Sequence, residues 1–256
     1  MAFADNYQRV VYETNPLVEV ICQLRFPKLL KIDVEPPAQF QARVMEDYPS
    51  LEELNAVQIA VGMDPSTGPI QRTKSYRFSS DDGEWNVVLS SDFLALTSIK
   101  YSRWEDFRGR LQKVTTALLD QYQLSHFSRV GLRYKDVILR SKVGEPPASW
   151  RELIRSEVLG LAGAEDLHGG VHSTYMSTMS AVVDGVNTII NAGFVEINET
   201  KEEGFLIDTD FSIDQKTNAD ANHAIERADS LHRLTGPVFR WCITEQLHSR
   251  LSPQVV

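Results

Sequence analysis

A short segment occurs twice in this chain, and the repeat constrains the fold more than any other feature. Residues 35–40 read EPPAQF, and residues 145–150 read EPPASW. Proline is tolerated in the first turn of a helix, so each copy predicts a helix start. A second pair follows in the same order, SDF at residues 91–93 and TDF at residues 209–211. The copies lie 110 and 118 residues apart, which predicts a duplicated unit with longer loops in its second copy.

The hydrophobic pattern predicts the same order of elements in both parts of the chain. After a lead-in without regular structure at residues 1–15, the first part contains a strand at 17–26, a helix after Pro36-Pro37, strands at 55–63, 72–80 and 85–100, and a helix at 104–122 with Ser102 as its N-cap. The second part contains a strand at 126–140, a helix after Pro146-Pro147, strands at 175–183, 186–197 and 204–214, and a helix at 222–251 that Gly236-Pro237 should kink or split.

We therefore predict an α+β fold built by tandem duplication of a β-α-β-β-β-α unit, with antiparallel sheets and helices packed on one face. The two copies would be residues 1–124 and residues 125–256, together forming one compact, pseudo-symmetric unit.

Composition narrows the classes of function. The formal net charge of −9 disfavours binding to nucleic acid or to an anionic membrane, because both usually require a basic surface. No apolar run reaches the roughly 18 residues of a membrane span, and residues 1–5 show neither the basic nor the apolar part of a signal peptide. Cys22 and Cys242 lie in apolar patterns, so we expect buried free thiols and a cytoplasmic protein.

Two strands carry a family resemblance. Residues 15–20 read NPLVEV and residues 129–134 read RVGLRY. With these segments the chain resembles a sporadically distributed, uncharacterised family of prokaryotic proteins of about this length. That family opens with a Pro–apolar–Val–Glu strand and carries a mid-chain Arg–apolar–Gly–Leu–Arg–Tyr strand. The asparagine that usually follows is absent here, where Lys135-Asp136 stands after Tyr134. The patchy occurrence of the family implies accessory genes of mobile or defence systems, such as phage defence or toxin–antitoxin-like pairs.

Basic side chains of the two first strands are candidate binding residues. Arg25, Arg133 and Lys135 should point to the sheet face that the helices leave open. Paired guanidinium groups could bind an anion or an acidic partner surface. The alternative is structural: Arg25 and Arg133 would then form ion pairs with Glu19 or with the acidic strand of the second part.

That acidic strand is the candidate metal site. Asp208, Asp210 and Asp214 alternate with apolar residues, so they should share one face, with the first two roughly 7 Å apart. Such carboxylates could hold Mg²⁺ or Mn²⁺ for phosphoryl chemistry, although an acidic strand is more often a solvated face or a guarded edge. His168 and His172 are a weaker zinc or nickel candidate.

The sequence favours a protein without catalytic activity. It contains no nucleophile elbow, phosphate-binding loop, dinucleotide fingerprint or Cys-x-x-Cys pair, and we expect no cofactor. We expect a monomer or homodimer that binds a protein partner, such as one encoded in the same operon, through the open sheet face or a groove between the copies. The alternatives are a metal-dependent enzyme acting on a phosphoester or nucleotide with Asp208 and Asp210, and a small-molecule sensor.

Overall fold

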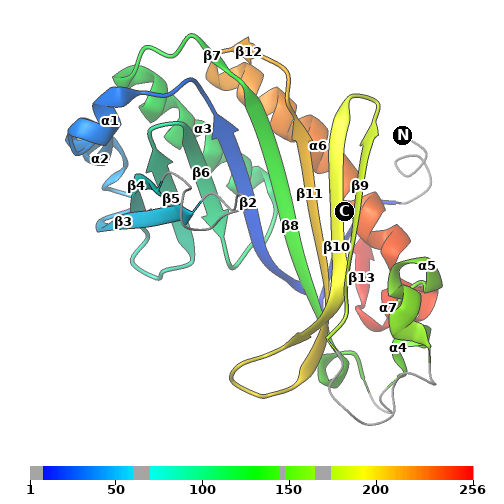
Figure 1. The fold of residues 1–256 in the computed structure, drawn as a ribbon. Helices are drawn as coiled ribbons and strands as arrows, with labels where there is room; N and C mark the ends of the chain where they lie inside the picture. The colour runs from blue at the N-terminus through cyan, green and yellow to red at the C-terminus, as the bar shows by residue number, and fades with distance from the viewer. Residues whose placement is uncertain (1–7, 60–69, 145–147, 165–173, 256) are drawn as a thin grey trace. The chain divides into compact units, whose positions relative to one another are not determined.

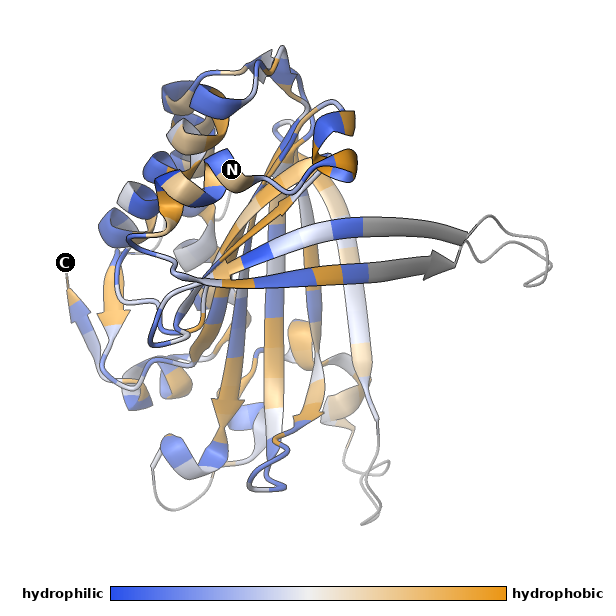
Figure 2. Ribbon diagram, turned by 90° about the vertical axis from the view of Figure 1, so that its left-hand side faces the viewer, coloured by the Kyte–Doolittle hydropathy of each residue, from blue (hydrophilic) through white to orange (hydrophobic). Residues whose placement is uncertain are grey.

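The computed structural model describes residues 8–59, 70–144, 148–164 and 174–255. Helices alternate with antiparallel strand pairs, which confirms the α+β class (Figure 1). Figure 2 shows both hydrophobic and hydrophilic residues on the helices, as expected for helices with one side against a sheet. Within these ranges, no helix has the length and apolar character that crossing a membrane would require.

The chain divides into two compact units. Unit 1 contains Met1–Val20, Leu132–Ile213 and Asp229–Val256, and unit 2 contains Ile21–Gly131 and Asp214–Ala228. Strands β2 (Leu17–Arg25) and β8 (Arg129–Leu139) and helix α6 (Ala221–Cys242) each have residues in both units. The duplication of residues 1–124 as 125–256 stays a prediction.

Unit 1 is built on long antiparallel strands. Its hydrogen-bonded strand order is β2-β8-β11-β10-β9. Besides its parts of β2, β8 and α6, it contains β1 (Val10–Tyr12), a 3-10 turn at Arg140–Lys142, α4 (Trp150–Leu153), α5 (Ser156–Leu159), a second 3-10 turn at Gly160–Gly163, β9 (Met176–Val183), β10 (Val186–Glu196), β11 (Glu203–Ile213), α7 (Glu245–Arg250) and β13 (Pro253–Val255).

One face of these strands forms the core of unit 1. Alternation along β8 buries Leu132, Tyr134 and Ile138 on this face. The Tyr134 hydroxyl is 3.0 Å from Nδ1 of His232 on α6, and Trp150 of α4 packs with its ring centroid 5.8 Å from that of Phe205 on β11. Helices α6 and α4 therefore cover this face, as the sequence predicted for one side of the sheet.

Unit 2 combines shorter strands with one long helix. Its hydrogen-bonded strand order is β3-β4-β5-β6-β2-β8. Its other elements are α1 (Leu30–Val34), α2 (Ala38–Val44), β3 (Ser50–Ile59), β4 (Ile70–Ser79), β5 (Trp85–Ser90), β6 (Phe93–Ser98), α3 (Trp104–Gln121), β7 (His126–Phe127) and β12 (Thr217–Asn218). Phe40 of α2 packs edge-on against Phe78 of β4, and α3 buries Phe107, Leu111 and Leu118, so the helices again supply the core.

The prediction of a single strand at 85–100 was wrong. The structure turns at Ser91 and Asp92, between β5 and β6. The carbonyl of Ser91 accepts a hydrogen bond from the Leu29 N–H (2.7 Å), and that of Asp92 accepts one from Phe26 (3.1 Å), so both leave the strand ladder. Residues 209–211 lie inside β11, and the two halves of the second sequence echo therefore occupy different structures.

Several boundaries also differ from the sequence prediction, and β3, for example, begins at Ser50 rather than at residue 55. Residues 10–12, expected to lack structure, pair with β13, Val10 lying opposite Val255. Helix α6 continues through Pro237, and the break comes instead after Cys242, where Thr244 caps α7 by accepting a hydrogen bond from the Leu247 N–H (3.2 Å). Helix α3 begins after Arg103 rather than Ser102. The predicted turn at 64–68 and the prolines at 146–147 lie outside the described residues.

Candidate functional site

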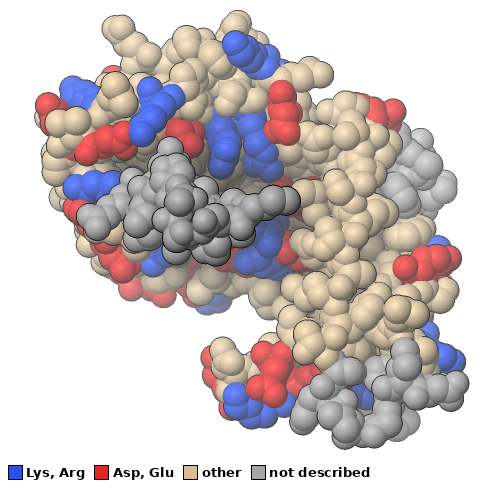
Figure 3. All heavy atoms as spheres, in the orientation of Figure 1, with Lys and Arg blue, Asp and Glu red and all other residues tan. Residues whose placement is uncertain are grey.

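The second face of the unit 1 strands carries most of the residues singled out in the sequence. Directly opposed residues of antiparallel strands share a face, so the register of β9, β10 and β11 assigns each side chain. We call this side the open face; its polar and apolar members include Glu19, Arg133, Lys135, Thr178, Ser180, Ile189, Asn191, Asp208 and Asp210. In Figure 3, strands β9 and β10 present a band without Lys, Arg, Asp or Glu (tan).

Arg133 and Asp208 form the central pair of the open face. Arg133 Nε donates to Asp208 Oδ1 (2.7 Å) and Nη2 donates to Oδ2 (2.5 Å), so the guanidinium occupies both carboxylate oxygens. The Asp208 side chain is 5% exposed and that of Arg133 is 39% exposed. The hydrogen bonds to Asp208 raise the pKa of Arg133 further above its ordinary value, so the guanidinium stays charged.

The pair continues as a polar row across four strands. Asp208 on β11 lies directly opposite Asn191 on β10, and Asn191 lies opposite Thr178 on β9. The Thr178 hydroxyl donates to Asn191 Oδ1 (2.8 Å). Two hydrogen-bonded pairs, Arg133 with Asp208 and Thr178 with Asn191, thus lie in one row from β8 to the exposed strand β9.

The other basic candidates also have acidic or amide neighbours. Lys135 forms a short ion pair with Glu19 on β2. In unit 2, Arg25 Nε donates to Gln23 Oε1 (3.3 Å). For Arg133, the structural alternative of an ion pair with the acidic strand is what the structure shows; Arg25 instead contacts an amide.

The three aspartates, weak candidates for a metal site in the sequence, do not lie together in the structure. Asp208 and Asp210 lie on β11, but Asp214 lies beyond the end of that strand in unit 2, where Arg129 Nε is 3.3 Å from its Oδ1. Both oxygens of Asp208 already accept from Arg133. Among the described residues, no group of three or more His, Cys, Asp or Glu side chains could hold a metal ion. His168 and His172 lie outside those residues.

Sequence reasoning missed a buried carboxyl group, that of Asp136. It lies on the core face of β8 between Tyr134 and Ile138 and is 7% exposed. Within the described part of the chain, no hydrogen bond or ion pair reaches its side chain. Burial, and secondarily the nearby Asp208 carboxylate, raises the pKa of Asp136 to about 8, so it is mostly protonated at neutral pH. The sequence signal was an Asp in the apolar register of a strand.

Cys242 and Tyr12 are electrostatic neighbours of Asp136. Burial raises the pKa of Cys242 to about 12, and the Asp136 carboxyl adds to this effect. Burial also raises the pKa of Tyr12 to about 12, and its hydroxyl lies 2.9 Å from Nδ1 of His248. Burial lowers the pKa of His248, so its imidazole is neutral at pH 7. The cysteines are buried free thiols, as predicted, and such thiols are poor nucleophiles.

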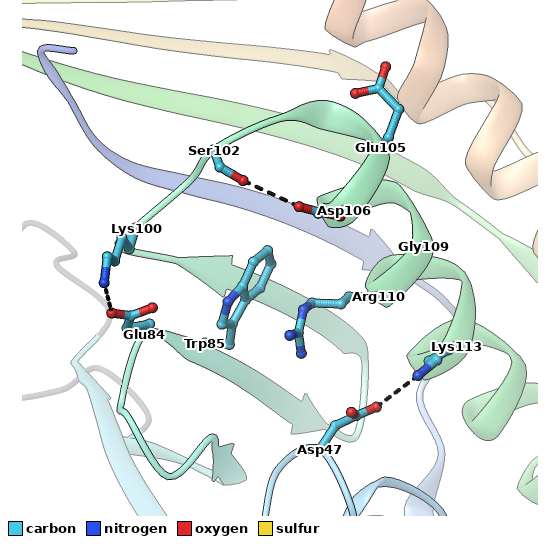
Figure 4. Close-up of a pocket in the computed structure, with 10 residues that line it drawn as sticks. All are labelled: Asp47, Glu84, Trp85, Lys100, Ser102, Glu105, Asp106, Gly109, Arg110 and Lys113. Carbon is cyan, nitrogen blue, oxygen red and sulfur yellow. Dashed lines mark hydrogen bonds and ion pairs between the residues drawn. The ribbon is translucent and has the colours of Figure 1, made fainter. Parts of the chain in front are cut away.

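Unit 2 has a surface hollow of about 590 Å³ between β5 and α3 (Figure 4). The guanidinium of Arg110 stacks over the ring of Trp85 at 4.5 Å. The lysines at its rim are paired, Lys100 with Glu84 (2.5 Å) and Lys113 with Asp47 (3.3 Å). Because acidic and basic side chains neutralise one another there, the hollow shows no preference for a ligand of either charge.

Comparison with known proteins gave no match for the chain. The chain matches no protein-family model, and no curated protein or solved structure is significantly similar to it. The function must therefore be argued from the site itself.

Proposed function

We propose that this protein is a noncatalytic binding protein that recognises a protein partner through the open face of unit 1. The observation that carries the proposal is the row of Arg133, Asp208, Asn191 and Thr178, in which two hydrogen-bonded pairs, Arg133 with Asp208 and Thr178 with Asn191, lie in register on four strands. A surface whose side chains are already ordered loses little entropy on binding. Polar groups in fixed positions select a partner by complementary charge and hydrogen bonding.

The charges of the open face suit a protein surface better than a polyanion. Arg133 is balanced by Asp208 and Lys135 by Glu19, so no basic patch accumulates around these residues. The whole chain carries a net charge of −9. Nucleic acid binding normally draws on uncompensated Lys and Arg side chains. A partner with mixed charges and some apolar surface fits this face.

The metal-dependent enzyme has less support. A divalent cation at Asp208 would have to displace the guanidinium of Arg133 from both oxygens, and the third aspartate lies beyond the strand. A role as an accessory component of a mobile or defence-type bacterial system, with the partner encoded in the same operon, rests on the family resemblance of residues 15–20 and 129–134.

The test is a tagged pull-down from the native host, analysed for proteins, small molecules and metals. The informative variant is Ile189→Arg, which adds a long cation to the open face while leaving the charge pairs intact; Ile189 lies opposite Asp210 and Ser180. The control is Leu161→Arg, because Leu161 is an exposed apolar residue of unit 1 outside these strands. Both should fold, as checked by circular dichroism and thermal melting.

We expect a stoichiometric protein partner with the wild type and with Leu161→Arg, and its loss with Ile189→Arg. A bound metal or nucleotide in the absence of a protein partner would refute the proposal. Equal capture by all three proteins would place the partner site elsewhere.

A further inference from the structure

Strand β9 ends the strand order of unit 1. The Phe194 N–H donates to the Tyr175 carbonyl (2.9 Å), and the register continues with Ala192 opposite Ser177 and Ile190 opposite Met179. In an antiparallel ladder, alternate residues bond to the neighbouring strand. The odd-numbered residues of β9 therefore bond to β10, and the even-numbered ones direct their N–H and C=O groups away from it. Among the described residues, no strand pairs with that outer side.

The sequence of β9 lacks the charged residues and the proline that normally discourage pairing at a strand edge. Its sequence from Met176 to Val183, MSTMSAVV, contains no charged residue and no proline. Met176 and Met179 are each 48% exposed, and Val182 is 70% exposed. An unpaired edge with these properties is a template for another strand.

Strand β3, which ends the strand order of unit 2, shows the contrast. It carries Glu52 and Glu53, paired with Arg77 (3.0 Å) and Lys74 (3.1 Å) on β4. Charged side chains of this kind discourage edge-to-edge pairing. Strand β3 therefore carries charged side chains that oppose pairing with another strand, and β9 carries none.

We propose that β9 is a homodimerisation strand, which pairs antiparallel with β9 of a second copy about a twofold axis at Met179. This inference goes beyond the protein-partner proposal and does not depend on it. In this register the even residues form the hydrogen-bonded pairs, Met176 with Val182 of the second copy and Thr178 with its Ser180, which matches the direction of the backbone groups that point away from β10. Met179 then lies opposite Met179 of the second copy.

The side chains match in this register. Apolar Met176 faces Val182, small Ser177 faces Ala181, and hydroxyl-bearing Thr178 faces Ser180. Other registers lose the match. With the axis at Thr178, apolar Met176 would face Ser180. With the axis at Ser180, Thr178 would face apolar Val182. Cross-strand pairs of like polarity stabilise a sheet, and a self-complementary strand favours a second copy over an unrelated peptide.

The expected affinity is modest. The pairing supplies about eight backbone hydrogen bonds and a few apolar contacts, which places the interface at the small end of stable contacts. We expect dimerisation in the micromolar range.

The first experiment is sedimentation velocity of the full chain from about 1 to 200 µM. The mass should rise from 28.9 kDa toward twice that value. Met179→Lys and Met179→Glu should each be monomeric throughout, because like charges would face one another at the axis. An equimolar mixture of the two variants should dimerise again, because opposite charges then meet.

The matched control is Leu51→Lys on β3. Leu51 is 47% exposed, close to the 48% of Met179, and lies on the other terminal strand. This variant should dimerise like the wild type. A wild type that stays monomeric at 200 µM would overturn the proposal, and so would a dimer that Met179→Lys leaves intact.

A cross-link tests the register independently. Met179 would be a non-hydrogen-bonded pair with itself, with Cα atoms about 4.5 Å apart, within the range for a disulfide. Met179→Cys should form a covalent dimer under mild oxidation. Ser177→Cys should not, because it would face Ala181 of the second copy. Cys22 and Cys242 are buried and should not react. Equal cross-linking by both variants would exclude this register.

Discussion

The guanidinium of Arg133 holds the carboxylate of Asp208 through two parallel hydrogen bonds of 2.7 and 2.5 Å. The Asp208 side chain is only 5% exposed, so these bonds replace nearly all the water that the carboxylate would otherwise bind. Arg133, at 39% exposure, keeps part of its own hydration. The pair therefore fixes β8 to β11 and also presents a charged group at the open face.

Removing the guanidinium should leave a buried, unpaired carboxylate. We expect Arg133→Met to lower the free energy of unfolding by about 2–3 kcal/mol, measured by urea denaturation at pH 7. Arg133→Lys should cost less, because it keeps the charge but loses the second hydrogen bond.

The double variant Arg133→Met/Asp208→Leu is the control, since it removes both charges. It should recover part of the lost stability, with a coupling energy of about 1–3 kcal/mol. If the losses of unfolding free energy in Arg133→Met and in Asp208→Leu sum to that of the double variant, the interaction between the two side chains does not contribute to stability.

The buried carboxyl of Asp136 predicts a loss of stability as pH rises. Its pKa is about 8 in the folded protein, against about 4 in the unfolded chain. Between these values the unfolded state releases a proton that the folded state retains, so ionisation favours unfolding. The contribution is full below about pH 4 and declines up to about pH 8, by at most about 1.4 kcal/mol per pH unit.

Asp136→Asn should remove this dependence. The variant keeps the shape of the side chain but cannot ionise, so its stability relative to the wild type should increase from pH 5 to pH 8. Denaturation at several pH values measures the difference. A constant difference between the two proteins across this range would mean that Asp136 does not titrate there.

Much of the fold could be predicted because its signals are local. Strict alternation marks the strand at 17–26, where the structure has β2, and the three- and four-residue steps of Phe107, Leu111 and Leu118 mark α3. Asp184 and Gly185, both with positive φ, form the turn expected between β9 and β10. The prediction of one strand at residues 85–100 arose because apolar residues lie on both sides of Ser91 and Asp92, and the turn at these two residues depends on hydrogen bonds from Leu29 and Phe26.

The site depends on contacts that no local pattern encodes. Arg133 and Asp208 are 75 residues apart, and their pairing requires the relative register of β8 and β11. Alternation placed Asp208 and Asp210 on a strand but could not show where the strand ends, and Asp214 lies beyond that end. Asp136 does carry a local signal, because it is an ionisable residue at a position of β8 where alternation predicts an apolar one.

Occupation of Asp208 by Arg133 predicts that divalent cations will not bind there. We expect the melting temperature of the wild type to change by less than about 1 °C in 5 mM MgCl₂ or MnCl₂, because a ligand stabilises a fold only if it binds it. Asp208→Asn/Asp210→Asn should respond to the same salts as the wild type does. A rise of several degrees that this variant abolishes would revive the metal-dependent enzyme.

The turn between β9 and β10 predicts opposite effects for two Gly→Ala substitutions. Gly185 has φ +78°, and a Cβ added there would meet no heavy atom within 4 Å, so the cost of Gly185→Ala is conformational alone. We expect a loss of about 1–2 kcal/mol. Gly109 lies in helix α3, where a Cβ would also meet nothing within 4 Å, and its φ is not positive. Gly109→Ala should add about 0.5–1 kcal/mol. Thermal and urea denaturation measure the change in stability of both variants. Destabilisation of equal size at the two positions would show that steric crowding by the added Cβ, and not backbone conformation, causes the effect.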